Sequence, residues 1–316
     1  GAQCNLASLL GGDRHAFSAG AYDDRPAAHA ITAADLGTLI SSTGVPRDGL
    51  AQVKRVATFA SHFGRVLAHA DPTLTPISLA PEPSATSVVP LRGARGSAVF
   101  ILLDDAAKKP SHLTLARPDG STLPVPLPDQ PVAWVLFDTH LVNRSSLDWC
   151  TLAAFAQSGR VLVCYGPANQ TGSVSINGSA LELIAPSGQT PLIVEHEGIV
   201  IVVCSEPMID ATIVGPQGVY IGVQALDAAG DPVPHPSFKT RWHITPEGES
   251  SKSSSGNNNA PSARAPSLTG WARAACDTHV SGEHPRFKAL KTPASLTALN
   301  TSTGYGWYRL TFKGKG

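Results

Sequence analysis

The tripeptide Glu195-His196-Glu197 places two carboxylates beside a histidine. In a β-strand Glu195 and Glu197 point to one side and His196 to the other, so the two acids could flank a sugar or bind a cation. A retaining glycosidase needs such a pair, with its carboxyl groups about 5 to 5.5 Å apart. However, an apolar run starts directly afterwards at Ile199. We therefore interpret the tripeptide as a polar turn that precedes a buried strand.

Other reactive residue types lack the partners that their chemistry needs. Asp23 and Asp24 are adjacent, so in a strand their side chains face apart and do not share a metal or a substrate. Ser205 lies in no Gly-x-Ser-x-Gly elbow. The five cysteines show no Cys-x-x-Cys spacing, and Cys164 and Cys204 lie in strand-like runs where a thiol packs as a small apolar group. The sequence thus predicts no catalytic residue, no metal and no cofactor.

Composition excludes two classes of partner. The 316 residues have a formal net charge of zero and no basic run, so the electrostatic footprint of a nucleic-acid-binding protein is missing. The longest apolar stretch, residues 198–204, is far shorter than the roughly 20 residues of a membrane helix. With 29 glycines, 26 prolines and only 15% charged residues, the chain favours short strands joined by turns. We expect a soluble, mainly β protein that binds neither nucleic acid nor membrane.

The clearest helix is predicted over residues 46–70. Pro46 suits a first helical turn, and Asp71-Pro72 would stop the helix. Between them, apolar side chains recur at helical spacing at Val53, Val56, Phe59, Ala60 and Phe63. One face of this helix must therefore pack on another element. Residues 147–156 are predicted to form one or two further helical turns.

Strand patterns fill the middle of the chain. Turn signals at Pro118-Asp119-Gly120, Asn177-Gly178 and Pro216-Gln217-Gly218 separate them at the short spacing of antiparallel sandwiches. The predicted strands are residues 97–103, 111–116, 132–137, 160–165, 172–176, 180–184, 192–194, 198–204, 211–214, 219–225 and 239–244. We expect an antiparallel β-sandwich over residues 88–246, with six side chains buried: Val99, Ile101, Val161, Val163, Val200 and Val202.

Two segments read as connections. Residues 72–87 are rich in proline and small polar residues, which favours an extended connector. Residues 247–266 are mostly polar and offer little to offset ordering entropy, which favours a flexible linker. Residues 267–316 end on the aromatic stretch 304–312, which is typical of a strand. Because the chain starts at Gly1 without a methionine, we expect it to be a piece of a longer protein.

Three segments, in chain order, resemble the β-galactosidases of glycoside hydrolase family 35. Tyr22-Asp23-Asp24-Arg25-Pro26-Ala27-Ala28 and the helix at residues 52–67 are similar to the last strand and the closing helix of the family's barrel. Arg160-Val-Leu-Val-Cys-Tyr-Gly166 resembles a strand of the first β domain after the barrel. Gly304-Tyr-Gly-Trp-Tyr-Arg309 is similar to the strand that opens the family's galactose-binding-like jelly roll.

The resemblance implies a domain order. Residues 1–71 would be the C-terminal remnant of a (β/α)8 barrel, and the sandwich would be an accessory domain. Residues 267–316 would begin a truncated jelly roll. The parent would be a retaining enzyme that removes terminal β-galactosyl residues with two glutamates on earlier barrel strands, outside this chain. It also implies an extracellular or periplasmic location.

Four residues are candidate carbohydrate contacts. The resemblance puts Tyr22 and Asp23 at the rim of a galactoside site. Trp271 and Tyr308 are aromatic side chains whose faces could stack on the C–H face of galactose. The alternative is a stand-alone carbohydrate-binding or structural β-sandwich protein without hydrolase activity. The upstream sequence would separate the two, because only the enzyme needs a barrel of roughly 250 residues.

Overall fold

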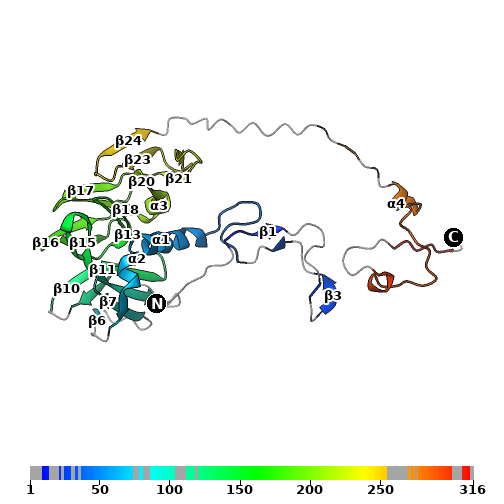
Figure 1. Ribbon diagram of the computed structural model, residues 1–316, viewed down its shortest axis with the longest axis horizontal. Coiled ribbons are helices and arrows are strands. Elements are labelled where there is room, and N and C mark those ends of the chain that lie inside the picture. Colours follow the sequence, from blue (N-terminus) through cyan, green and yellow to red (C-terminus); the bar gives the residue numbers. More distant parts are fainter. Residues whose placement is uncertain are drawn as a thin grey trace. The chain divides into compact units, whose positions relative to one another are not determined.

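The computed structural model describes residues 9–13, 21–22, 25–29, 33–34, 37–73, 78–80, 86–103, 112–117, 120–254, 270, 272–273, 275, 277–300 and 308–313. The chain divides into two compact units. Figure 1 labels strands and helices of the larger unit. The larger unit spans residues 51–258, and the smaller one combines residues 2–50 with residues 259–316. The chain is mainly β with several antiparallel sheets, which confirms the predicted fold class.

A seven-stranded sheet forms the centre of the larger unit. Its order is β16, β15, β12, β11, β8, β7 and β5, and all its pairs are antiparallel. The strands are β5 (Ala70–Pro72), β7 (Thr86–Gly93), β8 (Gly96–Leu103), β11 (Val132–His140), β12 (Ser146–Cys150), β15 (Thr171–Ile176) and β16 (Ser179–Ile184). A 3-10 turn, η1 (Val142–Arg144), connects β11 to β12.

Strands β8 and β11 send alternate side chains to opposite faces of this sheet, because the side chains of a strand alternate. On one face Val99, Ile101 and Val135 pack on a three-stranded sheet of order β10, β9 and β6. On the other face Trp134 and Leu136 join the main core. The three-stranded sheet consists of β6 (Ser78–Ala80), β9 (His112–Ala116) and β10 (Thr122–Pro126). The seven-stranded sheet is thus buried on both faces at its centre.

A four-stranded sheet of order β13, β14, β18 and β17 supplies much of the main core. Its strands are β13 (Ala153–Ser158), β14 (Val161–Gly166), β17 (Leu192–His196) and β18 (Ile199–Ser205). Every residue of β14 and β18 is buried, as the β-branched run after Ile199 predicted. The two strands pair in parallel, with Val161 opposite Val200, so the prediction of a purely antiparallel unit is wrong here. Central strands with both faces covered suit parallel pairing.

The predicted burial of six side chains is confirmed. Val99, Ile101, Val161, Val163, Val200 and Val202 are each at most 3% exposed. Full burial of such a side chain stabilises a fold by about 1.5 to 3 kcal/mol. They belong to two separate clusters, because β8 faces the three-stranded sheet while β14 and β18 lie in the main core.

The helix predicted at residues 46–70 is confirmed in a shorter form. It is α1 (Gly49–His62), followed after Phe63 by α2 (Gly64–Ala68). Phe59, Phe63 and Val66 are buried, and both phenylalanines pack in the main core. Val56, by contrast, is 48% exposed, so the buried stripe is narrower than the apolar pattern suggested.

A second four-stranded sheet, the β23 sheet, has the order β19, β20, β23 and β24. Its strands are β19 (Thr212–Gly215), β20 (Gly218–Ile221), β23 (Thr240–Ile244) and β24 (Ser250–Ser254), and the short helix α3 (Glu206–Asp210) leads into it. The hairpin of β21 (Val223–Leu226) and β22 (Pro232–Pro234) follows β20 in the chain. As predicted, Pro216-Gln217 forms the turn between β19 and β20.

The smaller unit contains short elements. Strand β1 (Gly12–Asp13) pairs with β4 (Ala33–Ala34), and β2 (Ala21–Tyr22) pairs with β3 (Arg25–His29). Its helical turns are α4 (Asp277–Ser281) and η2 (Thr297–Leu299). Residues 308–313 form no strand, so the prediction of an aromatic strand over 304–312 is wrong for the described part. Leu310 and Phe312 are exposed there, and without a partner strand an aromatic stretch has no ladder to join.

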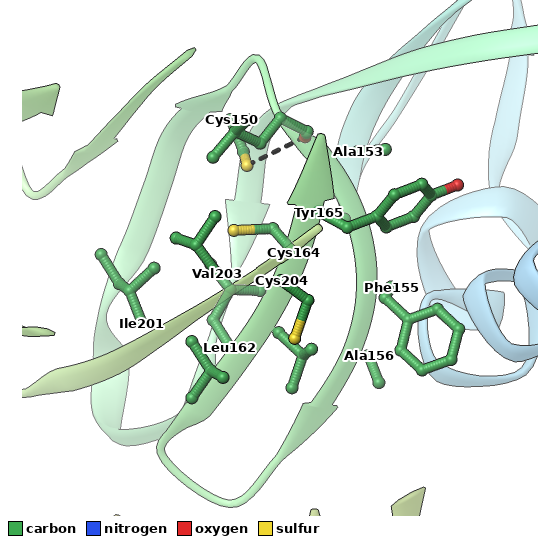
Figure 2. Packing of buried hydrophobic residues seen from close by; sticks show 14 of the residues in the cluster. Cys150, Ala153, Phe155, Ala156, Leu162, Cys164, Tyr165, Ile201, Val203 and Cys204 are labelled. Atoms are coloured by element: carbon green, nitrogen blue, oxygen red, sulfur yellow. Dashed lines mark hydrogen bonds between the residues drawn. The ribbon is translucent and has the colours of Figure 1, made fainter. Parts of the chain in front are cut away.

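Three buried cysteines lie in the main core. Cys150, Cys164 and Cys204 are free thiols with no exposed surface, as expected for Cys164 and Cys204 packing as apolar groups. Figure 2 shows Cys164 and Tyr165 leaving β14 toward opposite sides, with Tyr165 on the same side as Phe155. The Cys150 thiol donates to the carbonyl of Leu152. Burial raises the pKa of Cys204 to about 12, so this thiol stays protonated.

Several segments that were predicted as helical turns or as connections contain strands instead. Residues 147–156, predicted as helical turns, belong to β12 and β13. The connector at 72–87 contains β6 and the start of β7. The prediction of a flexible linker over residues 247–266 is wrong in its first part, because Ser250–Ser254 pairs with β23 as strand β24. Backbone hydrogen bonds form this ladder, and they do not depend on apolar side chains. Residues 255–266 lie outside the described part of the chain.

The hairpin between β15 and β16 has the predicted Asn177-Gly178 turn. Both residues have positive φ, of 52° and 80°, as a type I′ turn requires. We expect Gly178→Ala to lower the free energy of unfolding by about 1 kcal/mol, because alanine is strained at this φ. An added Cβ meets nothing within 4 Å, so the cost comes from the backbone alone. Urea unfolding measures it.

Gly188 is the matched control for this substitution. It too has open space around a Cβ, but its φ lies outside the left-handed region. Gly188→Ala should therefore leave stability unchanged or raise it slightly. Equal losses in the two variants would contradict the role of the turn.

Candidate functional site

The structure describes the side chain of one of the four predicted carbohydrate contacts. Tyr308 is 49% exposed, and its hydroxyl donates to the carbonyl of Ala294 at 2.6 Å. Tyr22 ends strand β2, and its side chain lies outside the described part. Asp23 and Trp271 also lie outside the described residues. A shared sugar site for these four residues stays a prediction.

The acidic pair beside His196 is split by a turn: the predicted polar turn is confirmed at Glu197 and is wrong for Glu195 and His196, which belong to strand β17. Glu195 belongs to β17 and accepts a hydrogen bond from Arg160 at 2.7 Å. Glu197 has a φ of 50° and forms the turn to β18 together with Gly198. The ring of His196 contacts the carbonyl of Ser179 at 2.9 Å. The two carboxylates therefore do not share the face of one strand.

A buried polar site of the larger unit surrounds Arg55 on α1, and we call it the Arg55 cluster. The guanidinium of Arg55 donates through Nε and Nη2 to the two carboxylate oxygens of Asp210, at 2.7 Å each. Its Nη1 reaches Glu206 at 3.3 Å and Gln130 at 3.4 Å. Arg55 is only 6% exposed although it is charged. Such burial requires a bidentate partner of this kind.

Two neutral groups complete the Arg55 cluster. The hydroxyl of Tyr165 donates to Oε1 of Gln130 at 3.2 Å, and the amide nitrogen of Gln130 donates to the carbonyl of Val132 at 2.7 Å. The guanidinium carbon of Arg55 lies 5.4 Å from the centre of the Tyr165 ring, within the range of a cation–π contact. Helices α1 and α3, strand β14 and the loop before β11 thus meet at one buried guanidinium.

Burial and charge shift the titration of these groups in opposing directions. Burial lowers the pKa of Arg55, but the hydrogen bond and the charge of Asp210 outweigh it, so the pKa is raised overall. Burial raises the pKa of Glu206, whereas the hydrogen bond from the backbone N–H of Asp129 and the charge of Arg55 lower it. Burial also raises the pKa of Tyr165 well above its usual range. The cluster holds a charged arginine and a neutral tyrosine at neutral pH.

One feature of the sequence indicates this cluster. Arg55 precedes Phe59 by four residues, so both lie on the same face of the helix. A charged residue on the buried face of a helix requires a buried counter-charge. Its partners Gln130, Glu206 and Asp210 are 75 to 155 residues away in the chain, where no local pattern identifies them.

Lys54, next to Arg55, lines a hollow of about 310 Å³ between α1 and β19, together with Ala57, Thr58, Ser61, His62, Thr212, Ile213 and Val214. Its ammonium donates to the backbone carbonyl of Asp210 at 2.6 Å. Burial lowers the pKa of Lys54 to about 8, and the charge of Asp210 opposes that shift. Lys54 is therefore charged at neutral pH but loses its proton more readily than an exposed lysine.

This shift predicts a pH dependence of stability. Because the folded-state pKa lies below the ordinary 10.5, the folded chain releases the Lys54 proton first as the pH rises. Between about pH 8 and 10.5 the unfolded chain holds more protons, so rising pH favours the folded state. Relative to Lys54→Met, the wild type should gain about 2 to 3 kcal/mol of unfolding free energy across this window.

Urea unfolding at the two ends of the window measures this gain. Lys239→Met removes an exposed lysine and serves as the control. Its difference from the wild type should stay constant over the same pH range. A constant difference for Lys54→Met as well would contradict the burial of the Lys54 amine.

Within the described ranges, no group of three or more histidine, cysteine, aspartate or glutamate side chains is arranged to hold a metal ion. Nor does any helix described there have the length and apolar character needed to cross a bilayer. The carboxylates of the Arg55 cluster both contact Arg55. Its arrangement joins α1 to α3 and does not present a free acid and a free nucleophile to a substrate.

Two comparisons with known proteins found no match. No protein-family model matches the chain. No curated protein sequence matches it either.

Proposed function

We propose that this chain is the non-catalytic, β-rich accessory part of a β-galactosidase-like glycoside hydrolase that acts on terminal β-galactosides in carbohydrate metabolism. In this proposal the enzyme works outside the cytoplasm, in an extracellular or periplasmic location. Its two catalytic glutamates belong to a barrel that precedes residue 1. The β unit supports that barrel and holds its last helix.

The attachment of α1 carries the proposal. The helix that resembles the family's barrel-closing helix is fixed to the β unit by the Arg55–Asp210 pair at 2.7 Å. On the same helix Phe59 stacks on Trp134 of β11, with ring centroids 4.8 Å apart. A helix bound by both a buried ion pair and an aromatic stack is a rigid joint. Such a joint suits a β domain that must keep a fixed position beside a catalytic domain.

The partners of four described carboxylates support a non-catalytic role. Asp210 and Glu206 contact Arg55, and Glu195 contacts Arg160. Asp148 accepts hydrogen bonds from Ser175 and from the backbone of Gly178, both at 2.7 Å. Glycoside hydrolysis needs one protonated acid and one free carboxylate on either side of a sugar. These four side chains instead have structural partners within the fold.

An activity assay tests the proposal. The purified 316-residue chain is incubated with a chromogenic β-galactoside, next to a longer protein that includes the preceding barrel. We expect the chain to match the buffer rate, because in this proposal the groups that supply an acceleration of about 8 to 23 kcal/mol belong to the preceding barrel. The longer protein should hydrolyse the substrate.

Three variants make the assay specific: Glu195→Gln, Glu197→Gln and Glu206→Gln. Turnover by the chain alone that disappears in one of them would identify that glutamate as catalytic and overturn the proposal. A longer protein that folds and binds saccharides without cleaving β-galactosides would favour the carbohydrate-binding alternative.

A further inference from the structure

The outer face of the β23 sheet bears a groove of about 410 Å³. The register explains why Tyr220, Arg241 and His243 line it, whereas Trp242 has the opposite parity and packs against the main core. Val219, Ile221 and Ile244 point into the main core, so the alternate residues of β20 and β23 point away from it. The residues that line the groove are Gln217, Tyr220, Val223, Pro232, Arg241, Trp242, His243, Ser251, Lys252 and Ser253. This volume falls in the usual range of small-ligand sites, about 300 to 1,000 Å³.

One wall of the groove is an aromatic pair. Tyr220 and His243 lie directly opposite each other on β20 and β23, and their rings stack with centroids 4.4 Å apart and an angle of 10°. Both rings are held through Gln217, whose side chain accepts from the Tyr220 hydroxyl at 2.9 Å and whose carbonyl lies 2.9 Å from Nε2 of His243. The wall is therefore fixed before any ligand binds.

Arg241 lies beside this wall between two small residues. Its partner across the strand pair is Ser253. On the other side is Gly222, where an added Cβ would lie 3.5 Å from the Cα of Arg241. Neither neighbour has a side chain large enough to cover a guanidinium. Among the residues that line this groove, Arg241 is the one arginine, and neither of these two neighbours supplies an acid to it.

The guanidinium of Arg241 has no partner in the described part of the chain. Its Nε is buried and makes no hydrogen bond. The groove lining contains no aspartate or glutamate. Arg55 and Arg160, by comparison, each bond to a carboxylate. A buried donor without an acceptor is unfavourable, so an incoming acceptor gains from pairing with it.

We propose that this groove binds a sugar unit that carries a carboxylate, as in an acidic polysaccharide. A carboxylate accepts two parallel hydrogen bonds from Nε and one Nη of an arginine, a geometry that a neutral hydroxyl cannot match. Because Nε of Arg241 is buried, pairing through Nε requires the side chain to move when the ligand binds, and no hydrogen bond opposes that movement. The hydroxyls of Ser251 and Ser253 and the amide of Gln217 supply further donors and acceptors for the sugar hydroxyls.

The choice of a sugar as the carrier of the carboxylate rests on the proposed function. The preference for an anion rests on Arg241 and on the absence of an acid in the lining. The experiment separates these two parts, because it measures binding alone and requires no catalytic domain.

The test titrates the full chain with methyl β-D-glucuronide and, in parallel, with methyl β-D-glucoside, which has the same ring without the carboxylate. Amide chemical shifts report where each ligand binds. We expect the glucuronide to bind with a Kd on the order of 1 mM and to shift resonances of β20, β23 and β24. The glucoside should bind at least about tenfold more weakly.

Three variants locate the contact. Arg241→Gln should weaken glucuronide binding about tenfold or more, and Arg241→Lys should restore only part of it, since lysine keeps the charge but not the paired donors. Arg95→Gln removes an exposed arginine from the hairpin between β7 and β8 and should leave binding unchanged. The melting temperature of each variant confirms that it is folded.

Equal affinity for the two glycosides would overturn the anion preference. Glucuronide binding that is insensitive to Arg241→Gln, or no binding at all by the folded chain, would overturn the site. Neither result affects the β-galactoside assay of the longer protein. Conversely, failure of that assay with retained glucuronide binding would overturn the proposed enzyme and leave this groove as the function of the chain.

Discussion

Asp210→Ala is expected to lower the free energy of unfolding by about 3 kcal/mol or more. The substitution leaves Arg55, which is 6% exposed, with Glu206 at 3.3 Å as its remaining carboxylate. A buried charge that loses its main partner typically costs about 3 to 5 kcal/mol. The side chain of Asp210 is itself 32% exposed, so water replaces part of the lost interaction and places the effect at the lower end. Urea unfolding followed by circular dichroism measures it.

Glu195→Ala is the matched control, since it removes the carboxylate of the Arg160–Glu195 pair. That pair has the same 2.7 Å separation, but the side chain of Glu195 is 61% exposed. Exposed ion pairs contribute at most about 1 kcal/mol, so we expect a loss no larger than that. Similar losses in the two variants would show that the Arg55 cluster does not exclude water, contrary to its described burial.

Trp134→Ala is expected to cost about 3 to 5 kcal/mol, the usual loss for a large aromatic side chain in a core. Trp134 is 1% exposed and stacks on Phe59 of α1. Its indole N–H donates to the carbonyl of Ala154 at 2.8 Å. The substitution therefore opens a cavity, removes the stack and leaves a buried carbonyl without its donor. Thermal and urea unfolding measure the loss.

Two comparisons divide this loss into its parts. Trp134→Phe keeps an aromatic ring and removes the indole donor, so about 1 to 3 kcal/mol should remain. A double-mutant cycle of Trp134→Ala with Phe59→Ala should reveal coupling of about 0.5 to 1.5 kcal/mol from the ring stack. Trp149→Ala, at a partly exposed tryptophan of β12, should cost clearly less than Trp134→Ala. Additive effects at Trp134 and Phe59 would contradict a stabilising stack between α1 and β11.

The strands could be predicted where β-branched residues run together. Residues 198–204 and 160–165 correspond closely to β18 and β14, because such side chains fit a buried strand. The stretch Ala153-Ala-Phe-Ala156 led to a wrong prediction, since alanine favours helices in isolation. In the fold this stretch pairs with β14 as β13, so tertiary pairing overrides the local preference.

The sites were harder to predict than the strands, for a physical reason. Arg55 and Asp210 are separated by 155 residues, and Arg241 becomes notable only once its lack of a partner is known. A single sequence records residue types and local spacing, but not which distant carboxylate meets which arginine. The turn at Glu197, in contrast, depends on local pattern alone and was predicted correctly.

The buried thiols of Cys150, Cys164 and Cys204 can report the rate at which the main core opens. With no exposed surface, these sulfurs can meet a thiol reagent only when β12, β14 or β18 separates from its neighbours. In the regime where labelling outpaces reclosing, the labelling rate equals the rate at which the core opens. Mass spectrometry of the three cysteine-containing peptides would then show whether these strands open together, as one cooperative unit, or one after another.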